Sequence, residues 1–210
     1  MVRQPQHPSR PERPIVTVAA EHGAGGDLVA QRVAAALGVP FLDRALPASL
    51  AASEESGRDR PLVGRLARAS TMLAGETVER IDPDEGRIRA ELGEFLVRAS
   101  VDGGVVLGRG GVLVLADAPT ALHVLLGGAR EGRVARVAER EGIDRDRAAR
   151  RVRAHDRARK EYVRRVFGVD PDDWTLYHLV VDTVALGIDA SVELVLAASR
   201  ARTRHPAKES

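Results

Sequence analysis

The sequence IVTVAAEHGAGGD, residues 15–27, decides the fold of this chain. A run of β-branched and small residues leads into a glycine-rich turn, and the helix-forming segment 28–37 follows at once. This order predicts a strand, a tight turn and a helix N-terminus, where main-chain N–H groups and the helix dipole can bind phosphate oxygens. A tight turn without any ligand gives the same pattern, so the stretch by itself leaves both interpretations open.

The stretch departs from the common phosphate-binding pattern G-x-x-x-x-G-K-[ST]. Gly25 fits the second glycine, whereas Ala20, Gly26 and Asp27 stand at the positions of the first glycine, the lysine and the hydroxyl residue. The chain contains two lysines, and neither lies in this loop. A dinucleotide-binding fingerprint is disfavoured as well, because Leu28 stands where the third glycine of G-x-G-x-x-G would be.

The composition of the chain narrows its class. A length of 210 residues with 44% hydrophobic content fits one domain, and the absence of cysteine excludes disulfides and thiolate sites. No apolar run approaches the roughly 20 residues that cross a bilayer, and the N-terminus lacks a secretory signal. We therefore expect a cytoplasmic protein with no membrane partner. A net charge of +2 and 3% aromatic residues also disfavour nucleic-acid binding.

Short apolar runs alternate with helical patterns along the chain. The expected strands are 15–19, 39–42, 104–107, 121–126 and 179–181. The expected helices are 28–37, 61–74, 82–100, 130–141, a long one from the cap Asp144 to about 167, and one capped by Asp189 to about 202. This alternation predicts an α/β fold with a five-stranded parallel sheet flanked by helices. We expect one domain over 14–202, between a disordered arm, 1–13, and a disordered tail, 203–210.

Glycine turns and arginines follow most of the expected strands. Because ligands of parallel sheets bind at the carboxyl ends of the strands, these groups should gather at one edge. The segment 130–165 is especially rich in arginine. It fits a solvated helix face or a phosphate-binding surface, since the arginine fork matches phosphate oxygens. The acidic turn 170–173 is expected to be exposed, although its residues could meet these arginines. Trp174 and Tyr177, with Phe167, are expected to pack a nearby loop.

The order of the motifs resembles the cytidylate kinase-like family, a divergent branch of the P-loop nucleoside monophosphate kinases. That family opens with S-R-E-[YF]-G-S-G-G-[RK], matched here by AAEHGAGGD over 19–27, and continues with [YF]-x-D-R, matched by FLDR over 41–44. Its G-R-G, R-x-x-R and D-x-x-R-x-x-Y motifs correspond to residues 108–110, 133–136 and 156–162. The resemblance covers about 15–198. It implies a three-layer P-loop NTPase fold with an arginine-rich helical lid over about 129–175.

The resemblance also implies an activity, the transfer of the ATP γ-phosphate to a nucleoside monophosphate, with CMP or dCMP favoured and ATP and Mg²⁺ as cofactors. The donor site would comprise Glu21, His22, Gly23, Ala24, Gly25, Gly26 and Asp27. The acceptor site would comprise Asp43, Arg44, Gly108, Arg109, Asp156 and Arg157. The catalytic arginines would be Arg109, Arg133, Arg136 and Arg159.

Two positions depart from the family pattern, because Ala20 and Asp27 replace basic residues. Asp27 is a candidate Mg²⁺ ligand, acting directly or through water. Alternatively it caps the helix, in a loop that no longer binds ATP well. The alternative function is therefore a catalytically weak or inactive nucleotide- or phosphate-binding protein on the same fold. The helical segment 61–100 is long enough to support a homodimer.

Overall fold

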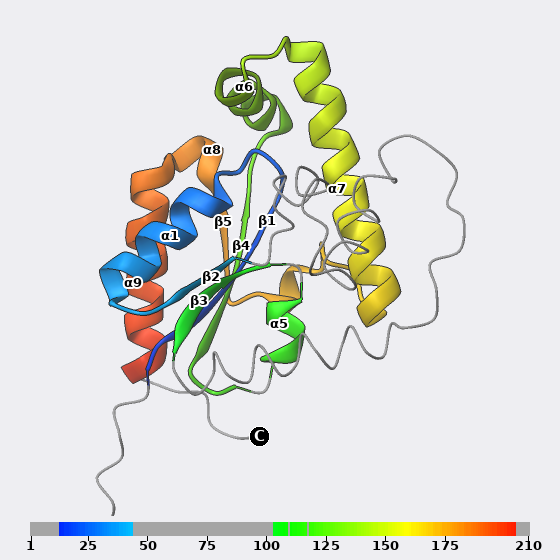
Figure 1. The fold of residues 1–210 in the computed structure, drawn as a ribbon. Helices are drawn as coiled ribbons and strands as arrows, with labels where there is room; N and C mark the ends of the chain where they lie inside the picture. The colour runs from blue at the N-terminus through cyan, green and yellow to red at the C-terminus, as the bar shows by residue number, and fades with distance from the viewer. Residues whose placement is uncertain (1–12, 44–102, 109, 117, 205–210) are drawn as a thin grey trace, which may run out of the picture.

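The computed structural model describes residues 13–43, 103–108, 110–116 and 118–204 (Figure 1). Several predictions concern residues outside these ranges. They are the arm, most of the tail, the helices expected at 61–74 and 82–100, the homodimer that these helices would support, and the roles of Arg44 and Arg109. Among the helices within the described ranges, none is both long and apolar enough to cross a bilayer.

The centre of the fold is a five-stranded sheet in the order β2-β3-β1-β4-β5, with every neighbouring pair parallel. The strands are β1 (Ile15–Ala20), β2 (Phe41–Asp43), β3 (Gly104–Leu107), β4 (Ala121–Gly127) and β5 (Leu179–Asp182). The predicted sheet is thereby confirmed. One strand begins two residues later than predicted, because the Val39 N–H donates to Ala34 O at the end of the preceding helix and Pro40 has no N–H.

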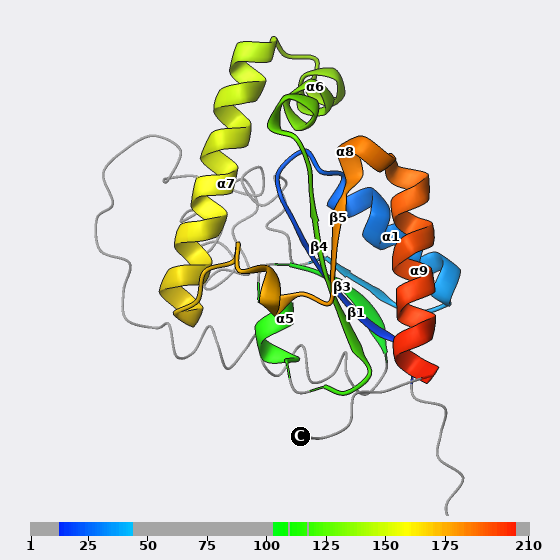
Figure 2. The ribbon, with the colours of Figure 1, turned by 180° about the vertical axis from the view of Figure 1, so that it is seen from behind.

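Helices cover both faces of the sheet, as Figures 1 and 2 show. The helices are α1 (Gly26–Leu37), α5 (Gly111–Val114), α6 (Arg130–Glu141), α7 (Arg145–Phe167), α8 (Thr183–Leu186) and α9 (Ile188–Arg204), with a 3₁₀ turn η2 (Trp174–Leu176). Val16 and Val18 of β1 pack against α1 and α9, and the opposite face, through Ala19, packs against α5 and Tyr177. The three layers follow from strands that are apolar on both faces.

One of the two predicted aspartate caps differs in the structure. Asp144 caps α7 as predicted, accepting from the Arg147 N–H at 2.8 Å. Asp189, by contrast, lies inside the first turn of α9 and does not cap it. The capping aspartate of this region is Asp182, which accepts from the N–H groups of Val184 and Ala185 at 2.9 Å and begins the unpredicted short helix α8. A four-residue helix is too short to show a hydrophobic period in the sequence.

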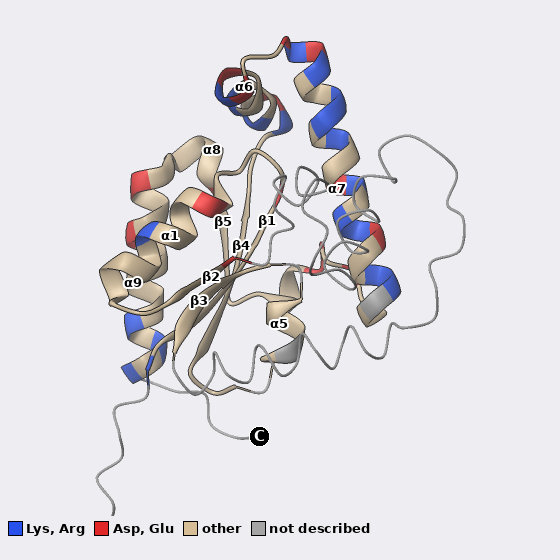
Figure 3. Cartoon of the chain, in the orientation of Figure 1, with Lys and Arg blue, Asp and Glu red and all other residues tan. Residues whose placement is uncertain are grey.

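Helix α6 lies beyond the carboxyl end of β4, and α7 begins beside it and runs down along the side of the sheet toward α5 (Figure 1). They pack on each other through Val134, Val137, Ala148 and Val152. Figure 3 shows Lys and Arg distributed along α7. The arginine-rich segment of the sequence is therefore placed beside the edge where the glycine loop lies.

Candidate active site

The glycine loop joins β1 to α1 at the carboxyl edge of the sheet. The Ala24 N–H donates to Glu21 O at 3.0 Å and closes a turn, and Gly23 and Gly25 have φ values of 83° and 75° that favour glycine. Gly25 is the N-cap residue of α1, and no side chain caps this helix. The first N–H groups of a helix have no acceptor within it. The end of α1 therefore offers main-chain donors and the positive end of a helix dipole to an anion.

A side chain at the position of Gly26 does not fit beside Ala20 in this structure. A Cβ atom at Gly26 would overlap the Ala20 Cβ and lie 3.4 Å from Leu107 Cδ1. Ala20 stands where the common pattern has its first glycine. The departures at positions 20 and 26 are therefore coupled, because the methyl group of one residue fills the space that a side chain at the other would need.

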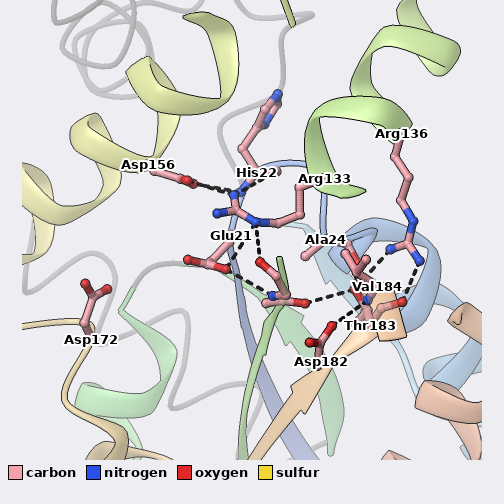
Figure 4. Close-up of polar contacts among 12 residues, drawn as sticks. Glu21, His22, Ala24, Arg133, Arg136, Asp156, Asp172, Asp182, Thr183 and Val184 are labelled. Carbon is pink, nitrogen blue, oxygen red and sulfur yellow. Dashed lines mark hydrogen bonds and ion pairs between the residues drawn. The ribbon is translucent and has the colours of Figure 1, made fainter. Parts of the chain in front are cut away.

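Arg133 of α6 is enclosed by acceptors from three segments, as Figure 4 shows. Its side chain donates to Gly128 O and His22 O at 3.0 Å and to Asp156 Oδ2 at 2.8 Å. Glu21 Oε2 lies 3.3 Å from its Nε, and the residue is only 4% exposed. Arg133 thus joins the glycine loop to both α6 and α7.

Arg136, one turn further along α6, reaches the start of α8. Its guanidinium donates to Thr183 O at 2.5 Å and to Thr183 Oγ1 at 3.1 Å. Thr183 is fully buried, and its hydroxyl donates to Ala24 O in the glycine loop at 2.7 Å. The sequence shows that Thr183 follows the last strand. It does not show this contact, which joins residues 159 positions apart.

Two more predicted site residues are engaged in ion pairs. Asp27 Oδ2 lies 2.8 Å from Arg140 Nη1. Arg159 is 5% exposed and lies 2.9 Å from Asp172 Oδ1. Lys160 also pairs with Asp172. The aspartates of the turn 170–173 are exposed as predicted, and Asp170 and Asp172 also pair with basic residues of α7, the other possibility that the sequence left open.

The aromatic residues of that region behave differently from one another. Tyr177 is buried and its hydroxyl donates to Pro171 O at 3.0 Å, as expected for a residue that packs a loop. Trp174 is 72% exposed, so its predicted packing role is wrong. It lies in the short turn η2, which has no buried residue.

A pocket of about 500 Å³ opens between α6, α7 and the glycine loop. Its basic lining residues are Arg130, Arg133, Arg153, Arg157, Lys160 and Arg164, and its acidic ones are Glu21, Asp156 and Glu161. Basic side chains outnumber acidic ones in this lining, and most of the basic ones lie on α7. The pocket can therefore attract an anion.

The predicted site residues divide into groups in the structure. Those around the pocket are Glu21, Arg133, Asp156 and Arg157. Asp43 and Gly108 lie at the ends of β2 and β3. Arg136 and Asp27 are not among the residues that line the pocket, and they contact Thr183 and Arg140. Sequence reasoning assigned no individual role to Thr183 or Arg140, since their partners Ala24 and Asp27 are far away in the chain.

His22 is the histidine of the loop. Its ring stacks on His155 of α7 with centroids 4.1 Å apart, and its main-chain N–H donates to Asp156 Oδ1 at 3.0 Å. Burial, reinforced by His155, lowers the pKa of His22 to about 4. Its Nε2 is buried without a hydrogen-bond partner within the described part of the chain. His22 is therefore a neutral packing residue at pH 7 in this arrangement.

The parallel sheet, the glycine loop between β1 and α1 and the basic helical pair define a P-loop kinase fold. Residues 15–185 match the model of the cytidylate kinase-like family, and the chain belongs to that family. It is 28% identical over 184 residues to a cytidylate kinase of Methanopyrus kandleri, covering 88% of this chain and 92% of the relative. The resemblance predicted from the motifs is confirmed.

Solved structures support the fold. A protein described as uncharacterised from Eubacterium ventriosum superposes with a TM-score of 0.66 at 19% identity, over 89% of this chain and 98% of that one. A gluconokinase of Sinorhizobium meliloti superposes with a TM-score of 0.52 at 18% identity, over 93% and 96% of the two chains. At these identities the similarity concerns the fold alone.

Proposed function

We propose that the chain is a nucleoside monophosphate kinase that transfers the γ-phosphate of ATP to CMP or dCMP. The observation that carries this proposal is the uncapped N-terminus of α1, preceded by the loop 21–25 and adjacent to the basic pocket. Main-chain donors of the loop would bind the donor phosphates. The names of the cytidylate kinase relatives favour cytosine as the acceptor base.

The reaction requires a positioned acceptor and neutralised charge. An oxygen of the acceptor phosphate forms a bond to the γ-phosphorus, while the bond to the β–γ bridging oxygen breaks and its electron pair leaves with ADP. Arg153 and Arg157, exposed on α7 and lining the pocket, can approach these oxygens without losing another partner that the structure shows. Arg44 and Arg109, outside the described residues, would bind the acceptor phosphate. Arg159 would serve a phosphate only after Asp172 releases it.

ATP would bring Mg²⁺, which neutralises phosphate charge when bound. The carboxylate that could hold the ion is that of Asp27, in the first turn of α1, directly or through water. In the present arrangement Asp27 already pairs with Arg140, so this role requires Arg140 to withdraw. The remaining loop donors are main-chain N–H groups, which bind phosphate oxygens and not the cation.

A nucleotide- or phosphate-binding protein without turnover is the second candidate. The specific observation in its favour is that Arg133, Arg136 and Arg159 are each held by protein acceptors. The loop also has no lysine to assist the transferred phosphoryl group.

The two candidates separate in one experiment. The protein is incubated with ATP, Mg²⁺ and, in turn, CMP, dCMP, UMP, AMP or GMP, and nucleoside diphosphates are measured. Turnover with CMP or dCMP that is lost in Arg157→Ala and kept in Arg200→Ala supports the kinase, since Arg200 is an exposed arginine on α9. Thermal stabilisation by ATP without any diphosphate supports the binding protein. No response to any nucleotide contradicts both.

A further inference from the structure

The two arginines of the R-x-x-R motif both reach the glycine loop, each by a different route. Arg133 contacts the loop directly, because its Nη1 donates to His22 O at 3.0 Å. Arg136 contacts it through Thr183, whose hydroxyl lies between the guanidinium and Ala24 O. His22 and Ala24 flank Gly23, the first glycine of the turn that has a positive φ.

The surroundings of both arginines leave them little reason to turn toward a ligand. Arg133 is 4% exposed and has carboxylates on two sides, Glu21 and Asp156. The Arg136 guanidinium donates to both oxygens of Thr183, which is itself fully buried. Turning either arginine toward a phosphate would leave buried acceptors without a donor, which is costly.

The loop depends on these contacts because it has few of its own. A side chain cannot stabilise it at Gly23, where a Cβ would lie 2.6 Å from Arg133 O. No side chain caps α1 at Gly25. The main-chain oxygens of His22 and Ala24 are thus held from outside the loop, by α6 and by the start of α8.

We propose that Arg133 and Arg136 are positioning residues that hold the glycine loop in its phosphate-binding shape, and that they do not contact the phosphates. Arg136 acts through Thr183, whereas Arg133 contacts the loop directly and Asp156 holds its guanidinium in place. The phosphates are then contacted by the exposed basic side chains that line the pocket, and Arg130 is the one of these on α6. The proposal rests on the proposed function only where binding of a phosphate ligand is the readout.

The test is a double-mutant cycle with Arg136→Ala, Thr183→Val and the double variant. Two quantities are measured: hydrogen exchange of the amides of residues 23–26 in the free protein, and the Kd for inorganic tripolyphosphate, which requires neither a base nor turnover. We expect each single variant to accelerate exchange and weaken binding by about tenfold, since losing a hydrogen bond to a charged group changes an equilibrium by that order. The double variant should show the same exchange rates and the same Kd as each single variant, because both substitutions break the same contact between Arg136, Thr183 and the loop.

Two further variants separate the proposal from a general loss of structure. Thr183→Ser keeps the hydroxyl and should restore both exchange and binding. Arg130→Ala removes a pocket charge from the same helix and should weaken tripolyphosphate binding while leaving loop exchange unchanged.

The proposal is overturned if Arg136→Ala weakens binding with unchanged loop exchange, or if the losses of the two single variants multiply in the double variant. The first result means that Arg136 contacts the phosphate directly, and the second means that Arg136 and Thr183 act independently of each other. If the unmodified protein binds neither tripolyphosphate nor ATP, the proposed function fails. The exchange measurement on the free protein still decides the role of Arg136 and Thr183 in that case.

Discussion

Arg133 Nη1 lies 2.8 Å from Asp156 Oδ2, and this ion pair joins α6 to α7 directly beside the glycine loop. The same carboxylate accepts from the His22 main-chain N–H through its other oxygen. One aspartate therefore connects the helical pair and the loop.

Removing the Asp156 carboxylate should destabilise the protein strongly. Asp156→Ala should lower the free energy of unfolding by about 3 kcal/mol, because it leaves the buried Arg133 with less compensation and the His22 N–H without its acceptor. Urea denaturation measures the change. Asp189→Ala is the matched control, since Asp189 also pairs with an arginine but its side chain is 88% exposed, and it should cost less than about 1 kcal/mol. Equal losses in the two variants would contradict the importance of the buried pair.

Restoring the lysine of the common loop pattern should fail unless position 20 changes too. Gly26→Lys should lower the free energy of unfolding by about 1–3 kcal/mol, because its Cβ overlaps the Ala20 methyl group. Adding Ala20→Gly removes that methyl group and should recover much of the loss. Thermal denaturation of both single variants and the double variant measures this coupling. Additive losses would mean that the methyl group is not the obstacle.

Alanine substitutions of Asp27 and Arg140 should shift the Mg²⁺ dependence of ATP binding in opposite directions if Asp27 holds the ion in the proposed reaction. Arg140→Ala frees the carboxylate from its 2.8 Å ion pair and should lower the Mg²⁺ concentration for half-maximal ATP binding. Asp27→Ala should raise it. Titration of Mg²⁺ at fixed ATP measures both, with Arg32→Ala as a control for an arginine whose partner, Asp189, lies on α9. An unchanged Mg²⁺ dependence in Asp27→Ala removes the metal role.

Acid should destabilise the protein through its buried histidines. Burial, with a contribution from His178, lowers the pKa of His123 to about 4, and the pKa of His22 is also about 4. Below pH 6.5 the unfolded chain protonates these histidines while the folded chain keeps them neutral. Stability is therefore complete above pH 6.5 and decreases as the pH falls toward 4, by up to about 1.4 kcal/mol per pH unit for each group.

Urea denaturation between pH 7 and pH 5 measures this slope. The variant His123→Gln should show a smaller slope, because one of the groups that take up a proton on unfolding is gone. It should also be less stable at pH 7, since Thr17 Oγ1 lies 2.8 Å from His123 Nδ1. A slope unchanged by the substitution would contradict the lowered pKa of His123.

The sheet and the loop could be predicted because their signals are local. The apolar runs at 15–20 and 104–107 are buried on both faces, and Gly23 and Gly25 adopt the positive φ values that a glycine turn supplies. The short helix α8 could not be predicted in the same way. Four residues carry no period, and the choice of Asp182 over Asp189 as a cap depends on where β5 ends.

The sequence by itself determined the parallel α/β architecture, the glycine loop and the arginine-rich helices, since each depends on neighbouring residues. Only the tertiary structure decided which arginines have protein partners. Arg133 and Arg136 meet residues 111 and 47 positions away, and no local pattern encodes such contacts. Chain folding brings His22, Asp156 and Thr183 to the same edge of the sheet. Burial there makes an unpartnered charge costly, so the arginines are held by the protein itself.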